Sequence, residues 1–253
     1  MNYLNIDQNL STKKQKQYTI FIKKVKNWIS QKVASAKASG ITLGLSGGID
    51  SSVLAILCDE VFPKNAYFYY FEIKEDKKTK KDLEELAKHL KNEIKIINLK
   101  NEYESLAKTL SIKDKLSKAN LKSRLYMSSL YALSQEKNTL VIGTDNYDEY
   151  FLGYFTKYGD GGCDLLPFAN INKTQVYVLA NMLDIPECII KKEPSANLYP
   201  NQTDEKELGF NYETFELWKR DCNLVSKEIN DKIIKLHKTS EHKRNLIPKG
   251  PKL

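Results

Sequence analysis

The chain has 253 residues, of which 41% are hydrophobic and 28% are charged. This composition is that of an ordinary globular protein, and it excludes a wholly disordered chain, a collagen-like repeat and a disulfide-rich scaffold. No apolar run approaches the roughly 20 residues that a membrane-spanning helix needs, so we expect no membrane partner. A chain of this length forms one or two domains, and we predict a single domain over residues 1–253.

Lysine and arginine together number 40 against 32 acidic residues, so the net charge at pH 7 is +8. Such an excess favours polyanionic partners, for example nucleotides or nucleic acid. The positive charges are spread along the chain and form no long block, which is typical of solvated surfaces. The charge therefore assigns no ligand by itself, and we expect no nucleic-acid partner.

The cysteines are widely separated and include no CxxC pair, so neither a zinc site nor a redox dithiol is predicted. The first 13 residues are polar and lack the apolar segment of a signal peptide. Both observations favour reduced thiols and a cytoplasmic protein. The cysteines are Cys58, Cys163, Cys188 and Cys222.

Hydrophobic periodicity predicts helices that alternate with strands along the chain. A helix is predicted over residues 15–34, and the apolar run 41–45 predicts a strand that leads through a glycine turn into a second helix. Because the strands read as apolar on both faces, we predict an α/β fold with a doubly wound, mostly parallel sheet and helices on both faces. Further strands are predicted at 66–73, 94–99 and 140–143, and further helices at 79–91, 102–110, 118–135 and 174–183.

The predicted domain has a core and a C-terminal part. We place the core of the fold at residues 41–192 and C-terminal helices at residues 212–245. Between them, residues 193–209 contain two prolines and few large apolar residues, which predicts a mobile loop. Long loops in compact domains are often functional.

The strongest chemical signal lies between the first predicted strand and the helix that follows it. There the sequence reads Gly44-Leu45-Ser46-Gly47-Gly48-Ile49-Asp50-Ser51. Glycine lets the backbone approach a ligand closely, and the N–H groups of a helix N-terminus favour phosphate. Asp50 can hold Mg²⁺ against the same phosphates. The alternative is an ordinary glycine turn with a capping residue, and the GK[ST] ending of a Walker A loop is absent.

The segment SGGIDS resembles the pyrophosphate-binding loop of the ATP pyrophosphatase superfamily, whose members cleave ATP between its α and β phosphates. Several later motifs are similar to those of NAD synthetases, and they occur in that family's order from about Gly44 to Arg244. They are Val141–Asn146 with Glu149 and Gly153, the TKYGDGG segment Thr156–Gly162, Asn172–Val176, Pro194–Ala196 and Glu241–Arg244.

This resemblance implies an ammonia-dependent enzyme that amidates deamido-NAD to NAD with cleavage of ATP to AMP and pyrophosphate, through an adenylated intermediate. It also implies Mg²⁺ and a homodimer. Separately, we expect residues 193–209 to close over the adenylate and exclude water, because hydrolysis would waste it. Carried over position by position, the resemblance implies ATP contacts for Gly44, Leu45, Ser46, Gly47, Gly48, Ile49, Asp50, Ser51, Thr144, Lys173 and Ser195. It implies deamido-NAD contacts for Arg124, Lys157, Asp164, His242 and Lys243, and a magnesium site at Asp50 and Glu149.

Simpler interpretations stay open for several of these residues. Glu149 could be a surface acid, Lys157 and Asp164 could belong only to a glycine-rich turn, and His242 could stabilise a helix end. Two positions depart from the family's pattern. Tyr126 stands where a second arginine is frequent, and Asn197 stands where an aspartate is common.

Other functions compatible with the loop are also open. A tRNA-modifying ATP pyrophosphatase would suit the positive charge, although a thiolase would need a cysteine pair and a lysidine synthetase usually carries extra domains. A GMP synthetase would need dimerisation and amidotransferase parts, and we expect no glutaminase domain in the polar first 14 residues. A nucleotide-binding module without activity is the alternative from a different class, against which the joint presence of Asp50, Glu149 and Lys173 argues.

Overall fold

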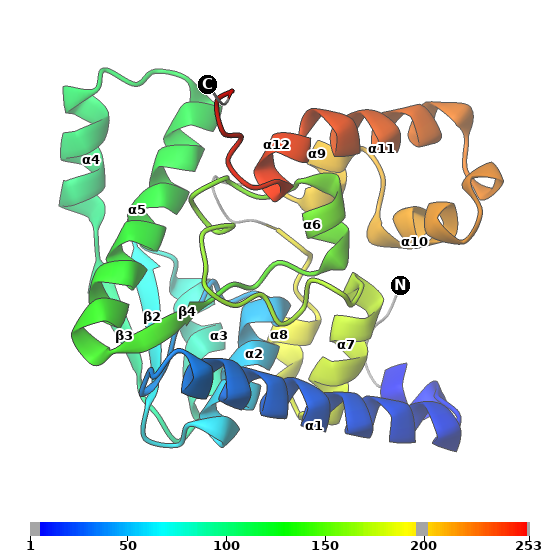
Figure 1. Cartoon of the computed structure of the whole chain (residues 1–253), viewed down its shortest axis with the longest axis horizontal. Helices are drawn as coiled ribbons and strands as arrows, with labels where there is room; N and C mark the ends of the chain where they lie inside the picture. The colour runs from blue at the N-terminus through cyan, green and yellow to red at the C-terminus, as the bar shows by residue number, and fades with distance from the viewer. Residues whose placement is uncertain (1–5, 196–201, 252–253) are drawn as a thin grey trace.

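A four-stranded parallel sheet lies at the centre of the part of the chain that the computed structural model describes, residues 6–195 and 202–251 (Figure 1). Its strand order is β3-β2-β1-β4, so the chain moves outward on one side of β1 and then returns to its other side. This reversal between β1 and β4 creates the crevice where ligands bind in open parallel sheets. The strands are β1 (Gly40–Gly44), β2 (Ala66–Glu72), β3 (Ile94–Asn98) and β4 (Thr139–Ile142).

Helices cover both faces of this sheet (Figure 1). Helix α5 packs on β1 and β4, whereas α2 packs on β1 and β2 and is itself covered by α1 and α7. Connections between parallel strands are right-handed. The connection from β3 to β4 crosses the sheet in the opposite direction to the connections from β1 to β2 and from β2 to β3, so its helix α5 lies on the other face. The helices of the core are α1 (Thr12–Ser35), α2 (Ile49–Val61), α3 (Lys77–Ala87), α4 (Lys100–Thr109), α5 (Lys115–Lys137), α6 (Tyr147–Leu152), α7 (Lys173–Met182) and α8 (Glu187–Ile190).

The main hydrophobic core fills the space between β1, β2 and the helices α1, α2 and α7. Helix α2 is apolar around nearly its whole circumference, because it is enclosed by the sheet on one side and by helices on the other. Each large side chain buried there contributes roughly 1.5–3 kcal/mol to folding. Its fully buried members include Leu54, Leu57, Phe68, Phe168 and Tyr177.

A second, smaller cluster joins the C-terminal helices to α6. Phe215 and Ile233 are fully buried in it, and Leu152 of α6 and Leu208 of α9 pack beside them. Figure 1 shows α10 and α11 to one side of the sheet, with α6 between them and the core. The elements are α9 (Asp204–Leu208), α10 (Tyr212–Arg220), α11 (Lys227–Thr239) and α12 (Glu241–Arg244), with short 3-10 turns at Ile6–Asn9 and Cys222–Leu224.

The parallel sheet and the helices on both faces are confirmed, and each predicted strand and helix of the core is present within a few residues of its expected bounds. The prediction that every strand is apolar on both faces is wrong for β3, in which Ile96 is 55% exposed. The physical reason is that β3 lies at one edge of the sheet, where the helices that pack on β1, β2 and β4 leave it largely uncovered. None of the described helices is long and apolar enough to cross a bilayer.

The predicted loop 193–209 is also shorter than expected. Helix α9 lies inside it, Leu208 is buried, and Gly209 ends the helix in a left-handed conformation. The ends of the remaining segment are tied together, because Ser195 Oγ donates to Gln202 O at 2.7 Å and Asp204 N donates to Pro194 O at 3.1 Å. The mobility of residues 193–209 stays a prediction, because residues 196–201, Asn197 among them, lie outside the described residues.

Candidate active site

The glycine-rich segment forms a tight connection between β1 and α2. Gly47 has φ +71°, a conformation that side-chain-bearing residues adopt at a cost. Gly48 is the N-cap of α2 and offers no side-chain hydrogen bond, so the first-turn N–H groups of the helix are available to an anion. The hydroxyls of Ser46 and Ser51 lie 3.2 Å apart, and Gly48 N donates to Ser46 Oγ at 3.2 Å. This is the local geometry of a phosphate site.

A cavity of about 810 Å³ opens at the carboxyl ends of the strands, where a ligand is expected in this fold. The structure brings the residues with implied ATP contacts to its wall, with the exception of Gly47. Those that line the cavity are Gly44, Leu45, Ser46, Gly48, Ile49, Asp50, Ser51, Thr144, Lys173 and Ser195.

Lys173 links the two acids with an implied metal role, Asp50 and Glu149. Its Nζ lies 2.5 Å from Asp50 Oδ2 and 3.1 Å from Glu149 Oε1, and only 4% of its side chain is exposed. Asn146 holds both carboxylates, since its side-chain amide donates to Asp50 at 3.0 Å and its backbone N–H donates to Glu149 at 3.1 Å. Glu149 is therefore not a surface acid.

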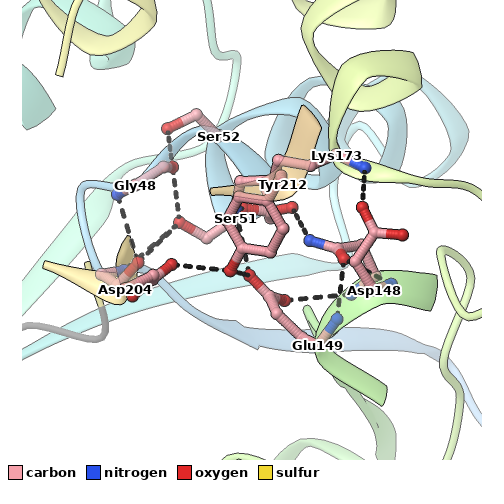
Figure 2. Close-up of polar contacts among 11 residues, drawn as sticks. Gly48, Ser51, Ser52, Asp148, Glu149, Lys173, Asp204 and Tyr212 are labelled. Carbon is pink, nitrogen blue, oxygen red and sulfur yellow. Dashed lines mark hydrogen bonds and ion pairs between the residues drawn. The ribbon is translucent and has the colours of Figure 1, made fainter. Parts of the chain in front are cut away.

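Two helix N-termini place these side chains. Asn146 caps α6 in a reciprocal arrangement with Glu149, and Asn172 caps α7 in the same way with Gln175. Lys173 is thus the first residue of α7, and its backbone N–H donates to Asp148 Oδ2 at 2.8 Å. Figure 2 shows Asp148 beside Glu149 on α6, facing the N-terminus of α7. The two capped helices hold Glu149 and Lys173 against each other.

The site carries more negative than positive charge. Burial by itself lowers the pKa of Lys173, but the Asp50 and Glu149 carboxylates outweigh it and raise that pKa well above its usual value. Burial raises the pKa of Glu149 to about 8; Lys173 opposes this, and Asp50 adds to it. Burial and the neighbouring Asp160 also raise the pKa of Asp145 well above its usual value. Such crowding of carboxylates favours a bound cation.

Oxygen ligands of this kind suit Mg²⁺. Two buried carboxylate oxygens at the cavity, Asp145 Oδ2 and Asp204 Oδ1, accept no hydrogen bond within the described structure. No group of three or more His, Cys, Asp or Glu side chains among the described residues could hold a metal ion by itself. The residues fit the usual mode of Mg²⁺, which is held by one or two carboxylates together with phosphate oxygens and water.

Two residues near Lys173 were not among the sequence candidates. Tyr212 OH donates to Asp204 Oδ2 at 2.7 Å and lies 3.4 Å from Glu149 Oε1 (Figure 2). The Lys173 ammonium lies 5.4 Å from the centre of the Tyr212 ring, a favourable cation–π distance. No local signal could have found this pair, because Asp204 falls in the predicted loop and Tyr212 in a helix of the second cluster.

The structure gathers four of the five residues with implied deamido-NAD contacts, but outside the lining of this cavity. Arg124 Nε donates to the backbone oxygen of Lys157 at 3.3 Å, and Lys157 Nζ donates to that of His242 at 2.5 Å. Lys243 Nζ donates to the backbone oxygens of Gly153 and Phe155 at 2.7 and 2.6 Å. His242 is exposed in the short helix α12, as the helix-end interpretation expects.

Asp164 makes contacts of a different kind. It accepts from Tyr131 OH at 3.0 Å and from the backbone N–H of Val141 at 2.8 Å. Asp164 therefore ties the chain just after the TKYGDGG segment to α5 and β4. Tyr126, the departure from the family's arginine, lines the cavity and stacks on Phe71 with ring centres 5.3 Å apart. An aromatic side chain therefore occupies a cavity position where the resemblance leads one to expect a cation.

The chain is similar in sequence to NAD synthetases. The profile of the family described as NAD synthase matches residues 21–247. The NH₃-dependent NAD⁺ synthetase of Mycoplasmopsis pulmonis is 48% identical over 223 residues, which cover 88% of this chain and 86% of that protein. That of Carboxydothermus hydrogenoformans is 39% identical over 235 residues, which cover 91% and 96%.

Solved structures agree with the sequence comparison. The structure of NMN synthetase from Francisella tularensis superposes with a TM-score of 0.86 at 38% identity and covers 92% of this chain and 98% of its own. The NH₃-dependent NAD synthetase of Campylobacter jejuni superposes with a TM-score of 0.80 at 28% identity, covering 92% and 99%. The profile match and these relatives, together with the glycine-rich loop and the Asp50–Lys173–Glu149 arrangement, show that the chain belongs to the NAD synthase family.

Proposed function

We propose that this protein is an ammonia-dependent NAD synthetase, which converts deamido-NAD, ATP and ammonia to NAD, AMP and pyrophosphate. The observation that carries the proposal is the convergence of the phosphate loop with Asp50, Lys173 and Glu149 in one cavity. The family and the names of its relatives support the substrate and the nitrogen donor.

The reaction proceeds in two displacements. An oxygen of the nicotinate carboxylate attacks the α phosphorus of ATP, the bond from that phosphorus to the bridging oxygen breaks, and pyrophosphate leaves with the bonding electrons. Ammonia then attacks the acyl carbon of the adenylate, AMP leaves, and the attacking nitrogen loses a proton to give the amide. The chain needs no covalent nucleophile for this chemistry, so its contribution is positioning and charge neutralisation.

Different residues of the site have different roles in this reaction. The N-terminus of α2 and the hydroxyls of Ser46 and Ser51 bind the leaving pyrophosphate. Lys173, kept protonated by its two carboxylates, supplies a fixed positive charge beside the phosphates. Thr144 and Ser195, which also line the cavity, orient the rest of ATP.

Asp50 and Glu149 would hold Mg²⁺ in this site. The ion, when bound, neutralises negative charge on the phosphate oxygens. The excess of carboxylates around Lys173 and the oxygen atoms of Asp145 and Asp204 that lack hydrogen bonds support a cation there. Chelation of the metal by EDTA is expected to stop NAD formation and excess Mg²⁺ to restore it.

Deamido-NAD would contact the group formed by Arg124, Lys157, His242 and Lys243, with Asp164 at its edge. Cations at this position suit the diphosphate and the nicotinate carboxylate of the dinucleotide.

Since this group does not line the cavity of a single chain, we propose a homodimer in which a second chain completes the substrate site. Exposed leucines on α4 and α5, such as Leu106 and Leu116, offer apolar contact area. Light scattering tests the dimer. The cytoplasmic location stays a prediction.

Nicotinate mononucleotide is a second candidate substrate because of one structural comparison. The Francisella tularensis structure, with which this chain shares 38% identity and a TM-score of 0.86, is that of an NMN synthetase. Nicotinate mononucleotide carries the same nicotinate carboxylate as deamido-NAD but lacks its adenylate half. The candidate activity is therefore amidation of the mononucleotide by the same chemistry.

One assay separates these possibilities. Purified protein with Mg-ATP receives either deamido-NAD or nicotinate mononucleotide, and either ammonium or glutamine, and the amide product, AMP and pyrophosphate are measured. The proposal predicts NAD, AMP and pyrophosphate in equal amounts with deamido-NAD and ammonium, and little product with glutamine. Faster turnover of the mononucleotide would assign the second activity instead. ATP binding without product from either substrate would contradict both, and would direct attention to tRNA substrates or to a module without activity.

A further inference from the structure

Lys192 contacts the phosphate loop, although none of the sequence motifs includes this residue. It is the second residue after α8, and its Nζ lies 3.3 Å from the backbone oxygen of Gly47. The same ammonium donates to Thr79 Oγ1 at 3.0 Å and to Asp82 Oδ2 at 3.3 Å. The loop after β1, the first turns of α3 and the end of α8 therefore meet at one side chain, of which 16% is exposed.

The partners of Lys192 are themselves held in place. Thr79 Oγ1 donates to Asp76 Oδ2 at 2.8 Å, and Asp76 caps α3 by accepting from the backbone N–H of Thr79. Asp82 is buried, with 6% of its side chain exposed. Because the elements that carry these acceptors are packed into the core, Lys192 has a rigid frame on one side and the loop on the other.

The contacts indicate positioning, not phosphate binding. A lysine ammonium has three N–H donors, and those of Lys192 have three acceptors: a backbone oxygen, a hydroxyl and a carboxylate. Its charge is balanced by Asp82, so it adds little net attraction for an anion. Gly47, whose carbonyl it holds, is the one residue of Gly44–Ser51 that does not line the cavity.

We propose that Lys192 is a positioning residue of the phosphate loop. By holding the Gly47 carbonyl on the side of α3, it keeps the left-handed Gly47 conformation and leaves the N–H groups that follow, at the start of α2, directed at the anion site. Lys192 also precedes Pro194 and Ser195, so it links the loop geometry to a second wall of the cavity. The inference rests on the proposed function only in taking the loop's ligand to be pyrophosphate or the phosphates of ATP.

The experiment compares three variants with the wild type. Lys192→Met removes the ammonium but leaves Asp82 buried without its cation, so it tests stability together with function. The double variant Lys192→Met/Asp82→Asn removes both charges and is expected to melt within a few degrees of the wild type. The matched control is Lys191→Met, because Lys191 is the adjacent lysine and is exposed in a surface pair with Glu187.

Two readouts are measured: binding of magnesium pyrophosphate by calorimetry, and the steady-state constants for Mg-ATP and deamido-NAD. In the double variant we expect pyrophosphate binding about tenfold weaker and kcat/KM for Mg-ATP lower by about tenfold or more, with KM for deamido-NAD unchanged, since one loop-fixing hydrogen bond is lost. Lys191→Met is expected to match the wild type in both readouts.

The outcomes are distinguishable. A stable double variant that binds pyrophosphate as tightly as the wild type would reduce Lys192 to a purely structural role and overturn the inference, as would a wild type that binds no pyrophosphate. If the wild type forms no NAD but the variants still weaken pyrophosphate binding, the proposed function fails while the positioning role of Lys192 holds.

Discussion

The ammonium group of Lys173 lies 2.5 Å from the carboxylate of Asp50, although 123 residues separate them in the chain. Asp50 is in the first turn of α2 and Lys173 is the first residue of α7, so two helix N-termini converge on one point. Helix N-termini favour negative charge. A carboxylate and phosphates can therefore share this place, and Lys173 balances part of their charge.

Replacement of Lys173 by methionine is expected to abolish most of the activity. The change removes the positive charge beside the phosphates, and loss of a preorganised electrostatic contact of this kind lowers kcat by about a hundredfold or more. It also leaves Asp50 and Glu149 without their buried cation, which costs about 3 kcal/mol of folding free energy. NAD formation and thermal melting in EDTA measure the two effects. Lys88→Met, which breaks an exposed pair with Glu85, is the control and should change neither.

Replacement of Gly47 by alanine is expected to weaken ATP binding. The residue has φ +71°, and an added Cβ would lie 2.6 Å from Thr79 Cγ2, so the loop must shift. The strain costs about 1–2 kcal/mol, and the displaced loop should raise KM for ATP by about tenfold or more. Gly250→Ala is the control, since no atom of the described residues, apart from its chain neighbours, lies within 4 Å of its added Cβ. An unchanged KM for ATP in Gly47→Ala would show that the loop geometry is unimportant.

Replacement of Tyr212 by phenylalanine is expected to lower stability without removing the ring from Lys173. The hydroxyl donates to Asp204, which is buried and has one oxygen that accepts no hydrogen bond from the described residues. Loss of this donor costs about 1–2 kcal/mol. Thermal melting measures the change, with Tyr158→Phe at a 52% exposed tyrosine as the control. Equal melting temperatures for the two variants would contradict the assignment.

The four cysteines are expected to react with iodoacetamide at very different rates. Burial raises the pKa of both Cys58 and Cys163 to about 12, so at pH 8 only about one molecule in ten thousand carries the reactive thiolate at either position. Cys222 is exposed. Mass spectrometry of the native protein should find Cys222 alkylated first, and Cys58 and Cys163 only after unfolding in guanidinium. As the pH rises toward 12 the thiolate fraction increases, so the protection conferred by the pKa decreases.

Local patterns were sufficient for most of the elements. The periodicity that predicts α1 and the helix after the glycine turn reflects faces that are buried in the structure, so these predictions are confirmed. The short helix α6 was not predicted, although the pair Asn146 and Glu149 is a readable capping signal. The exposure of β3 could not be read from its apolar residues, because it depends on which strands the helices cover and not on the residues themselves.

By itself the sequence determined the phosphate loop, because a strand, a glycine turn and a helix N-terminus are contiguous in the chain and their geometry is local. It also indicated Asp50, Glu149 and Lys173, because each of them lies within a short contiguous motif. Only the tertiary structure decided that Lys173 joins the two acids, that Tyr212 and Asp204 stand beside it, and that Lys192 holds Gly47. These contacts depend on how α3, α7, α8 and the second cluster pack on the sheet, and packing is determined by burial over the whole chain, which no local pattern contains.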